Sequence, residues 1–263
     1  MMKFIVLTLF PELLAAFWDN GIVRRAVHSG TIQPAAINIR DYAAGRHRVT
    51  DDRPYGGGCG MVMKPEPLAG ALRAARDAAP DATVVLLSPQ GRPFDQGLAR
   101  RLSAAAGLIL ICGRYEGIDE RVSEQFVDLE ISIGDYVLTG GELPAMVVMD
   151  AVTRLLPGAL GNEASAGQDS FGAERLDCAH YTRPPEFEGR TVPEVLLSGH
   201  HKEVARWRRA DALMRTLVKR PDLLERTALS ALELDLLAQW HREIDRLLHA
   251  QGIDRVDPSS GDR

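Results

Sequence analysis

The chain has 263 residues, of which 45% are hydrophobic and 25% are charged, and these values are ordinary for a globular protein. This length allows one large domain or two modest domains, with enough core to need no disulfide or metal for stability. The formal net charge of −5 argues against a protein that binds nucleic acid nonspecifically over its whole surface, so such a partner requires a local basic patch.

The cysteines and the first apolar segment bear on the compartment. Cys59, Cys112 and Cys178 lie far apart and form no CxxC motif. They predict no disulfide framework and favour a reducing, cytoplasmic compartment. The apolar segment 4–10 ends at Pro11 and is shorter than the apolar core of a signal peptide or a membrane span. We therefore expect no association with a membrane.

Short apolar runs alternate with helical patterns along the first two thirds of the chain. Strands are expected near residues 3–9, 36–39, 83–87, 108–112 and 129–133. Helices are expected over residues 12–18, 22–29, 66–79, 95–105 and 143–155. The alternation between residues 83 and 155 predicts an α/β fold with a mostly parallel sheet covered by helices.

Three of these strands end in loops rich in Ser, Pro and Gly, at residues 88–91, 113–117 and 134–141. The carboxyl ends of parallel strands share one edge of a sheet, which is where α/β proteins bind ligands. The second and third loops also carry Tyr115 and Tyr136, which suit a flat polar ligand. Because no GxGxxG motif follows a strand, a dinucleotide site is not expected.

A long polar segment, residues 42–63, lies between the early strands and the next helix. Four of the five residues 56–60 are glycine. A loop of this length inside a compact domain is usually functional or disordered. Gly57 and Gly58 would allow backbone N–H groups to approach an anion or a base, and the alternative is a flexible surface loop. No GK[ST] follows, so the segment is not a Walker A loop.

The composition changes after Pro157. Residues 158–180 are rich in Gly, Ala, Ser and acids, with little apolar periodicity, and this predicts an interdomain linker. Helices are expected over 202–220 and 230–250, followed by a polar tail that we expect to fray. We divide the chain into a domain over 1–160, a linker over 161–180, a helical domain over 181–250 and a tail over 251–263.

The first of these two helices is basic. Between His200 and Arg220, seven Lys or Arg residues stand against two acids, a local charge of +5. This favours either a solvated helix face or a surface that binds phosphates. Helical spacing predicts a core-facing stripe on each helix. Its members are Val204, Trp207, Leu213, Leu217 and Val218 on the first helix, and Leu232, Leu236, Trp240, Ile244 and Leu247 on the second.

The sequence offers candidate acids but no metal motif. Asp169 lies in the linker beside Ser170 and Phe171, which could bond to a base and stack on it. Most other loop acids, Glu142 among them, are expected to be surface charges or helix caps. Arg154 is near a helix C-terminus, where a cation is favoured whatever its function. No HExxH or Cys–His spacing indicates a metal, and no GxSxG indicates a serine hydrolase.

Several long strings occur in order along the chain. They are DDRPYGGGCGMVMKPEP (51–67), LSPQGR (87–92), CGRYEGIDERV (112–122) and SIGDYVLTGGELPAM (132–146), then DSF, LDCAHYTRP and VPEVLLSGHH. The chain resembles the bacterial tRNA (guanine-N1)-methyltransferases over about residues 2–248. A series of long motifs in order is far more specific than a single pattern. Cys59 is a departure, because the family pattern is expected to have proline there.

The resemblance implies a fold and a cofactor. It implies an α/β methyltransferase domain of the SpoU–TrmD (SPOUT) class with a deep trefoil knot, followed by a small α-helical domain. S-adenosylmethionine would bind bent within the knot, held by the three loops described above. The residues at matching positions are Leu87, Ser88, Pro89, Gly113, Tyr115, Glu116, Ile133, Gly134, Tyr136, Leu138, Gly140, Gly141 and Pro144.

The resemblance also implies a reaction, the methylation of N1 of the guanosine immediately 3′ of the anticodon in tRNA. Asp169 would be the general base and Arg154 would stabilise charge on O6. Gly57, Gly58 and Ser170 would contact the guanosine. The residues implied for tRNA phosphates are Arg206, Arg208, Arg209, Arg215 and Lys219.

The resemblance also implies a homodimer in which both chains build each active site. Magnesium is associated with its activity, yet this sequence shows no metal-ligand cluster and no ligands are assigned.

Two alternatives remain open. The first is a methyltransferase of the same fold that acts on another RNA or another base, which an assay of modified nucleosides would separate. The second is a noncatalytic RNA- or nucleotide-binding protein, for which Asp169→Asn would leave RNA binding intact.

Overall fold

The computed structural model describes residues 1–160, 169–172 and 174–253. The chain forms two compact units, Met1–Ala166 and Gly167–Arg263, and each is described here by itself. Of the segments expected to be linker and tail, residues 161–168, 173 and 254–263 lie outside the described residues.

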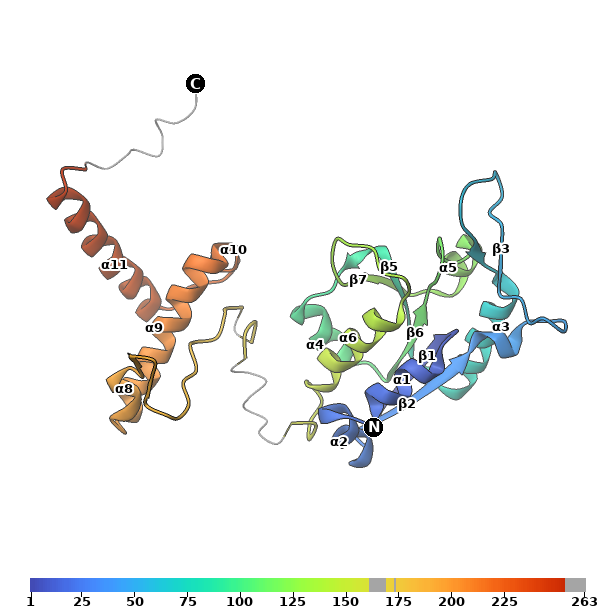
Figure 1. The fold of residues 1–263 in the computed structure, drawn as a ribbon, viewed down its shortest axis with the longest axis horizontal. Coiled ribbons are helices and arrows are strands. Elements are labelled where there is room, and N and C mark those ends of the chain that lie inside the picture. The colour runs from blue at the N-terminus through green and yellow to red at the C-terminus, as the bar shows by residue number, and fades with distance from the viewer. Residues whose placement is uncertain (161–168, 173, 254–263) are drawn as a thin grey trace, which may run out of the picture. The chain divides into compact units, whose positions relative to one another are not determined.

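The first unit is built on a five-stranded sheet in which every neighbouring pair is parallel. Its strands are β1 (Met2–Thr8), β2 (Ile32–Asn38), β5 (Thr83–Pro93), β6 (Gly107–Cys112) and β7 (Leu129–Ser132), in the spatial order β2-β1-β6-β5-β7. The predicted α/β class with a parallel sheet is therefore confirmed (Figure 1).

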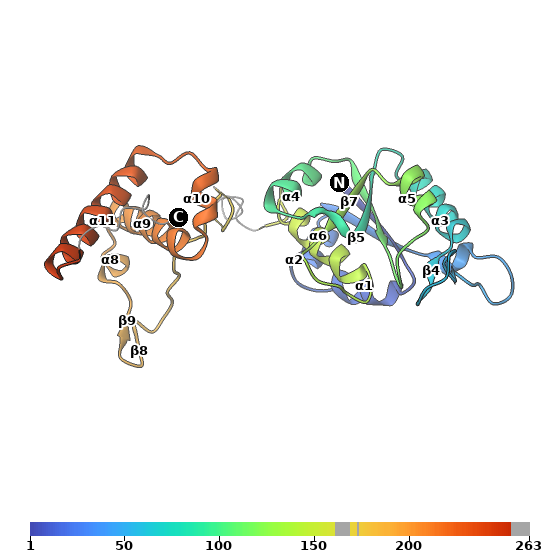
Figure 2. The same cartoon turned by 90° about the horizontal axis from the view of Figure 1, so that it is seen from above.

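Helices cover both faces of this sheet (Figure 2). The helices of the unit are α1 (Pro11–Trp18), α2 (Gly21–His28), α3 (Pro65–Ala78), α4 (Gln96–Ser103), α5 (Glu120–Phe126) and α6 (Glu142–Thr153), with a 3-10 turn η1 (Ile39–Tyr42). Alternate residues of a strand face opposite sides. On β6, Leu108 and Leu110 therefore join the core under α1, α2, α4 and α6, while Ile109 and Ile111 join the core under α3 and α5.

Three elements differ from the expectation. β5 does not end at Leu87 but continues to Pro93, with an irregularity in its pairing to β7 between Leu87 and Arg92. The segment Ser88–Gly91 was expected to be a loop because its residues favour turns, and it is instead a bulge within the strand. β2 begins at Ile32 rather than residue 36. Helix α5 was not expected, because Val122 is its one buried residue and its pattern is weak.

The glycine-rich segment 42–63 is closed by a small antiparallel ribbon. Its strands are β3 (Asp51–Asp52) and β4 (Val62–Met63), with Asp51 opposite Met63. Met63 is fully buried in the core under α3. The ribbon therefore fixes the base of the loop that carries the glycines.

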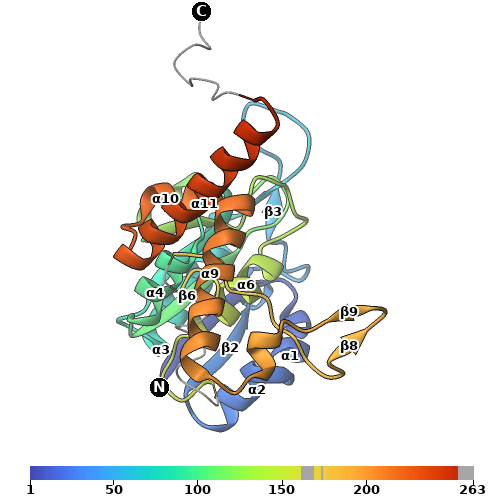
Figure 3. The ribbon, with the colours of Figure 1, turned by 90° about the vertical axis from the view of Figure 1, so that its left-hand side faces the viewer.

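The second unit is mostly helical. It contains a ribbon of β8 (Glu186–Phe187) and β9 (Arg190–Thr191), then α8 (Glu194–Leu197), α9 (His201–Lys219), α10 (Pro221–Arg226) and α11 (Ala231–Ala250). The ribbon projects away from the helices (Figures 2 and 3). Among the described residues of the whole chain, no helix combines the length and the apolar character needed to cross a membrane.

The predicted core stripes of α9 and α11 are partly wrong. Leu213 and Leu236 are buried, but Leu217 and Val218 on α9 are exposed. Ile244 and Leu247 on α11 are exposed as well. Figure 1 shows α11 running away from α9 toward its C-terminal end, so its last turns have no neighbouring helix among the described residues of this unit.

The central strand β6 gives a test of the core. Leu110 has no exposed surface and lies between β1 and β5. Replacing a buried leucine by alanine removes apolar contacts and leaves a cavity, so Leu110→Ala is expected to lower the free energy of unfolding by about 2–5 kcal/mol. Chemical denaturation would measure this. The matched control Val49→Ala lies on an exposed loop and should change stability by less than about 0.5 kcal/mol. Equal effects would contradict the assigned core.

Candidate active site

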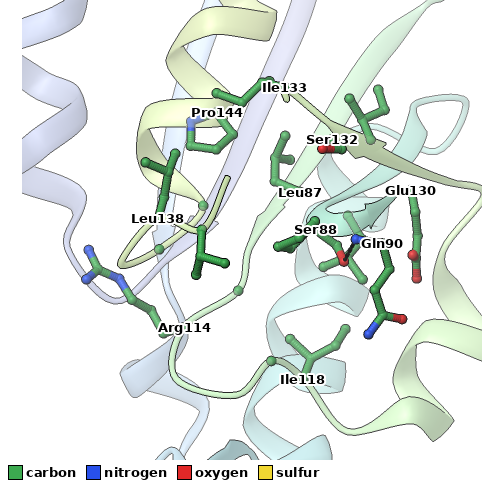
Figure 4. A pocket seen from close by; sticks show the side chains of 18 of the residues that line it. Leu87, Ser88, Gln90, Arg114, Ile118, Glu130, Ser132, Ile133, Leu138 and Pro144 are labelled. Carbon is green, nitrogen blue, oxygen red and sulfur yellow. Dashed lines mark hydrogen bonds between the residues drawn. The ribbon is translucent and has the colours of Figure 1, made fainter. Parts of the chain in front are cut away.

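A cavity of about 330 Å³ lies at the carboxyl ends of β5, β6 and β7. The bulge of β5, the loop after β6 and the loop after β7 meet there, as expected for a parallel sheet. All thirteen residues that the resemblance assigned to the cofactor line this cavity. Ile133, Leu138 and Pro144 form an apolar side, opposite the polar side chains of Gln90 and Glu130 (Figure 4).

Several other residues of the lining were given no role by the resemblance. Gln90, Arg114, Ile118, Glu130 and Ser132 also border the cavity. All of these except Glu130 lie within the long motifs quoted above, so position in a motif was an available signal for them. Glu130 is a strand residue, and nothing in the sequence distinguished it from a surface acid.

Two of the three loops touch through glycines. A Cβ atom at Gly141 would lie 2.6 Å from the Cα of Cys112, closer than real contacts allow, and one at Gly140 would overlap the side chain of Arg114. The Gly141 N–H donates to the carbonyl of Gly113 at 2.9 Å. Glycine is therefore required for this close approach of the turn before α6 to the end of β6.

A buried ion pair joins the same two loops. The carboxylate of Glu142 is 2% exposed and accepts hydrogen bonds from Thr8 Oγ1 at 2.7 Å and from Arg114 Nε at 3.3 Å. Arg114 Nη2 lies 2.9 Å from Glu142 Oε2, and Arg114 Nη1 donates to the carbonyl of Thr139. The guanidinium also lies over the ring of Phe10, 4.4 Å from its centroid. A charge this deeply buried requires its partner.

Cys112 is the last residue of β6, two positions before Arg114 of this ion pair. Burial raises the pKa of its thiol well above the ordinary value, and the charge of Glu142 raises it further. The thiol therefore stays protonated at neutral pH, and a protonated thiol is a poor nucleophile. Cys112 is a packing residue rather than a candidate for covalent catalysis.

The glycine-rich loop between β3 and β4 lies beside the cavity. The Glu116 N–H donates to the carbonyl of Met61 at 3.0 Å, and the Met63 N–H donates to Gly117 at 2.9 Å. A Cβ atom at Gly60 would overlap the Glu116 side chain. The loop that carries Gly57 and Gly58 is thus attached at its base to the loop after β6.

Arg154 lies outside the cavity of its own unit. It caps the C-terminus of α6, where its N–H donates to the carbonyl of Asp150 at 3.0 Å. Pro144, in the first turn of the same helix, borders the cavity. Ten residues separate Pro144 from Arg154, which corresponds to about 15 Å along the helix axis. The first turn of α6 therefore borders the cavity, whereas Arg154 lies at the opposite end of the helix.

Asp169 and Ser170 belong to the second unit. Asp169 is exposed, and its carbonyl accepts from the Gly172 N–H at 2.9 Å, which closes a turn. Ser170 Oγ accepts from the Asp177 N–H at 3.0 Å. The turn that carries the candidate base is thus bonded to the segment that follows it.

The five basic residues assigned to tRNA all lie on α9 but not on one face. Arg208, Arg215 and Lys219 are spaced by seven and four residues, so they share a side of the helix. Arg206 and Arg209 point to other sides. Arg206, Arg208, Arg209 and Lys219 are exposed, whereas Arg215 is half-buried and its Nε donates to Asp211 Oδ2 at 2.8 Å.

Within the described ranges, one group of three residues could offer atoms to a metal ion. The ligand atoms of Asp177, Cys178 and His180 lie within 4.8 Å of one another. Burial raises the pKa of the Asp177 carboxyl, but hydrogen bonds from His180 and the Cys178 backbone bring it below its usual value. Magnesium prefers oxygen ligands in octahedral geometry, and a thiol and an imidazole do not supply them. No magnesium ligands are assigned, and no catalytic step is derived through this ion.

The role of the Arg114–Glu142 pair can be tested through the free energy of unfolding. Removing one partner of a buried pair leaves the other charge without compensation, so Glu142→Gln is expected to lower the free energy of unfolding by about 3 kcal/mol. The matched control Asp41→Asn breaks the exposed Arg48–Asp41 pair and should cost less than about 1 kcal/mol. Chemical denaturation of both variants measures the difference. A Glu142→Gln protein as stable as wild type would show that the pair does not hold the loops.

Comparison with known proteins identifies the family. A family model described as "tRNA (Guanine-1)-methyltransferase TrmD" matches residues 2–226. A tRNA (guanine-N(1)-)-methyltransferase of Desulfatibacillum aliphaticivorans is 55% identical over 262 residues, which cover 100% of both chains. Proteins of the same name from Desulforudis audaxviator and Geobacter sulfurreducens are 54% and 55% identical over 92% of this chain and 97% and 99% of their own. The resemblance drawn from the motifs is confirmed, and the chain belongs to the tRNA (guanine-1)-methyltransferase family of enzymes.

Proposed function

We propose that this protein transfers a methyl group from S-adenosylmethionine to N1 of the guanosine immediately 3′ of the anticodon in tRNA. The observation that carries the proposal is the convergence of thirteen motif-matched residues on one cavity at the carboxyl edge of the sheet. Family membership supports the same reaction. Because tRNA is the substrate, the proposal includes a cytoplasmic location.

The lining of the cavity fits S-adenosylmethionine. Leu138 and Pro144 offer apolar surface, and Tyr115 and Tyr136 offer rings at its border. The carboxylates of Glu116 and Glu130 suit a ligand that carries a sulfonium and an ammonium group. When bound, the cofactor supplies an electrophilic methyl group. The close contact of the Gly113 and Gly141 loops supports the proposal that this part of the chain forms the trefoil knot of the family.

Asp169 is proposed as the general base. Guanine N1 carries a proton at neutral pH and is a poor nucleophile until that proton leaves. A carboxylate within hydrogen-bond reach of N1 would accept the proton. Negative charge then develops on O6, and the guanidinium of Arg154 would stabilise it.

The glycine-rich loop and the basic helix are proposed to hold the tRNA. The target base must leave its stack to be reached by the reacting groups. Gly57 and Gly58 would contact it through their backbone, and Ser170 would contact it through its hydroxyl. The exposed Arg206, Arg208, Arg209 and Lys219, together with the Asp211-paired Arg215, would bind phosphates and position the tRNA without reading its sequence.

A homodimer would bring Arg154 to a cavity. Arg154 lies about 15 Å along α6 from Pro144 at the cavity of its own unit, so a second copy is needed to place Arg154 at a cavity. Leu143 and Val147 are exposed one turn apart on α6, and Leu13 is exposed on the adjacent α1. An apolar patch of this kind favours burial against another protein surface.

Methyl transfer to tRNA transcripts tests the reaction. Transcripts would carry guanosine or adenosine immediately 3′ of the anticodon. We expect transfer from labelled S-adenosylmethionine only to the guanosine form. Asp169→Asn should lower the rate by about a hundredfold or more, because general-base catalysis typically contributes that much. Cofactor binding should be unchanged. Transfer to both transcripts would favour a methyltransferase with another target, and cofactor binding without transfer to either would contradict the enzyme assignment.

Subunit mixing tests the shared active site. Leu138→Arg blocks the cavity and Arg154→Ala removes the stabilising cation, so each variant alone should be nearly inactive. A mixed dimer has one site with both changes and one with neither, and should recover about a quarter of the wild-type activity when half of the dimers are mixed. A rate no higher than the sum of the separate variants would contradict a site built by both chains.

Val147→Arg, measured by sedimentation, should shift the protein toward monomer, whereas the loop variant Val49→Arg should not.

A further inference from the structure

The turn that carries Asp169 is closed by several hydrogen bonds, one of which goes to the carbonyl of Arg175. The Phe171 N–H donates to the carbonyl of Arg175 at 2.6 Å, and the Gly172 N–H donates to the carbonyl of Asp169 at 2.9 Å. The Asp177 N–H donates to Ser170 Oγ at 3.0 Å. Asp169 itself is exposed, and these hydrogen bonds fix the backbone that carries it.

The side chain of Arg175 leads from the turn into the core of the second unit. It forms an ion pair with Glu233 on α11, whose side chain is 1% exposed, whereas that of Arg175 is 19% exposed. Glu233 also accepts from the N–H of Ser230 at 2.8 Å, and the two residues form a capping box in which Ser230 is the N-cap and Glu233 occupies position N3. Burial alone would raise the pKa of the Glu233 carboxyl, but the bonds from Ser230 and the charge of Arg175 lower it below its usual value. The carboxylate is therefore charged at neutral pH.

Two more hydrogen bonds attach the following residues to α9. The Leu176 N–H donates to Thr216 Oγ1 at 3.1 Å, and the Ala179 N–H donates to Asp211 Oδ2 at 2.6 Å. Thr216 has no exposed surface. The segment after the turn is thus fixed on both long helices of the unit, and Arg175 links it to the buried carboxylate on α11.

We propose that Arg175 and Glu233 are positioning residues, which hold the turn of Asp169 in place on the helical unit before tRNA arrives. This inference rests on the proposed role of Asp169 as the general base. Fixing a catalytic group in advance removes the entropic cost of ordering it during the reaction, and a small displacement of such a group slows the chemical step. Neither residue touches the reacting atoms in this proposal, and both act through Asp169.

Single-turnover methyl transfer with the full chain, at saturating tRNA and S-adenosylmethionine, tests this inference. Arg175→Met keeps the length of the side chain but removes its charge, and should lower the rate by about ten- to a hundredfold, the cost of misplacing a catalytic group. Arg175→Lys retains the charge and should recover part of the loss. Amide exchange at Phe171 and Asp177 should become faster in Arg175→Met. The matched control Arg246→Met breaks the exposed Arg246–Glu243 pair on α11, the helix that carries Glu233. It should change neither the methyl-transfer rate nor the amide exchange.

A double-mutant cycle separates positioning from a merely structural role. If Arg175 acts through Asp169, adding Arg175→Met to Asp169→Asn should change the residual rate by less than about twofold. A further loss equal to that seen in the wild-type background would overturn the inference. So would an unchanged single-turnover rate in Arg175→Met with weakened tRNA binding. If Arg175→Met does not fold, Glu233→Gln, which keeps an acceptor for Ser230, provides the same cycle.

The proposed function can fail separately from this inference. A wild-type rate in Asp169→Asn would overturn the general-base assignment and the positioning role together. Loss of the rate in Asp169→Asn with a wild-type rate in the Arg175 and Glu233 variants would overturn the positioning role alone.

Discussion

The buried carboxylate of Glu142 is the point on which the first unit depends. It binds the end of β1 through Thr8, the loop after β6 through Arg114, and it begins α6. These three segments are far apart in the sequence and are joined at this group. A buried charge that has lost its partners is strongly destabilising, so the three segments hold one arrangement together. The loop after β6 and the turn before α6 both border the cavity, and the Arg114–Glu142 pair and the bond from Arg114 to Thr139 hold them together.

The sheet and the cavity could be predicted because their signals are local. Apolar runs that end at glycines mark parallel strands, and the carboxyl ends of such strands meet. The continuation of β5 through Ser88–Gly91 could not be predicted in this way, because those residues favour turns and the strand is recognised only from the pairing of Arg92 and Pro93 with β7 beyond them. Glu142 was interpreted as a surface charge or a helix cap, because acids in loops usually are one or the other, and its burial was not expected. Its place at the start of an apolar helix was a signal that could have corrected this interpretation.

In the second unit, hydrophobic periodicity along the helices predicted only some of the buried residues. A helical stripe indicates which side of a helix is apolar but not how far a neighbour covers it, so Ile244 and Leu247 were wrongly placed in the core. The role of Asp169 came from the family motif, since the surrounding residues have no pattern of their own. The Arg175–Glu233 pair joins positions in a turn and a distant helix, and charged residues of either sign are common in both. Only the folded chain reveals such a contact.

The strand order also constrains how the chain reaches this fold during synthesis. β1 lies inside the sheet, where residues 3–7 pair with residues 107–111 of β6. The ribosome therefore releases an apolar strand well before its central partner exists. Contacts between such distant segments form slowly, because closing the intervening loop costs entropy before any pairing repays it. Until β6 emerges, one edge of β1 stays unpaired, and in that interval the nascent chain is most exposed to aggregation or to capture by a chaperone.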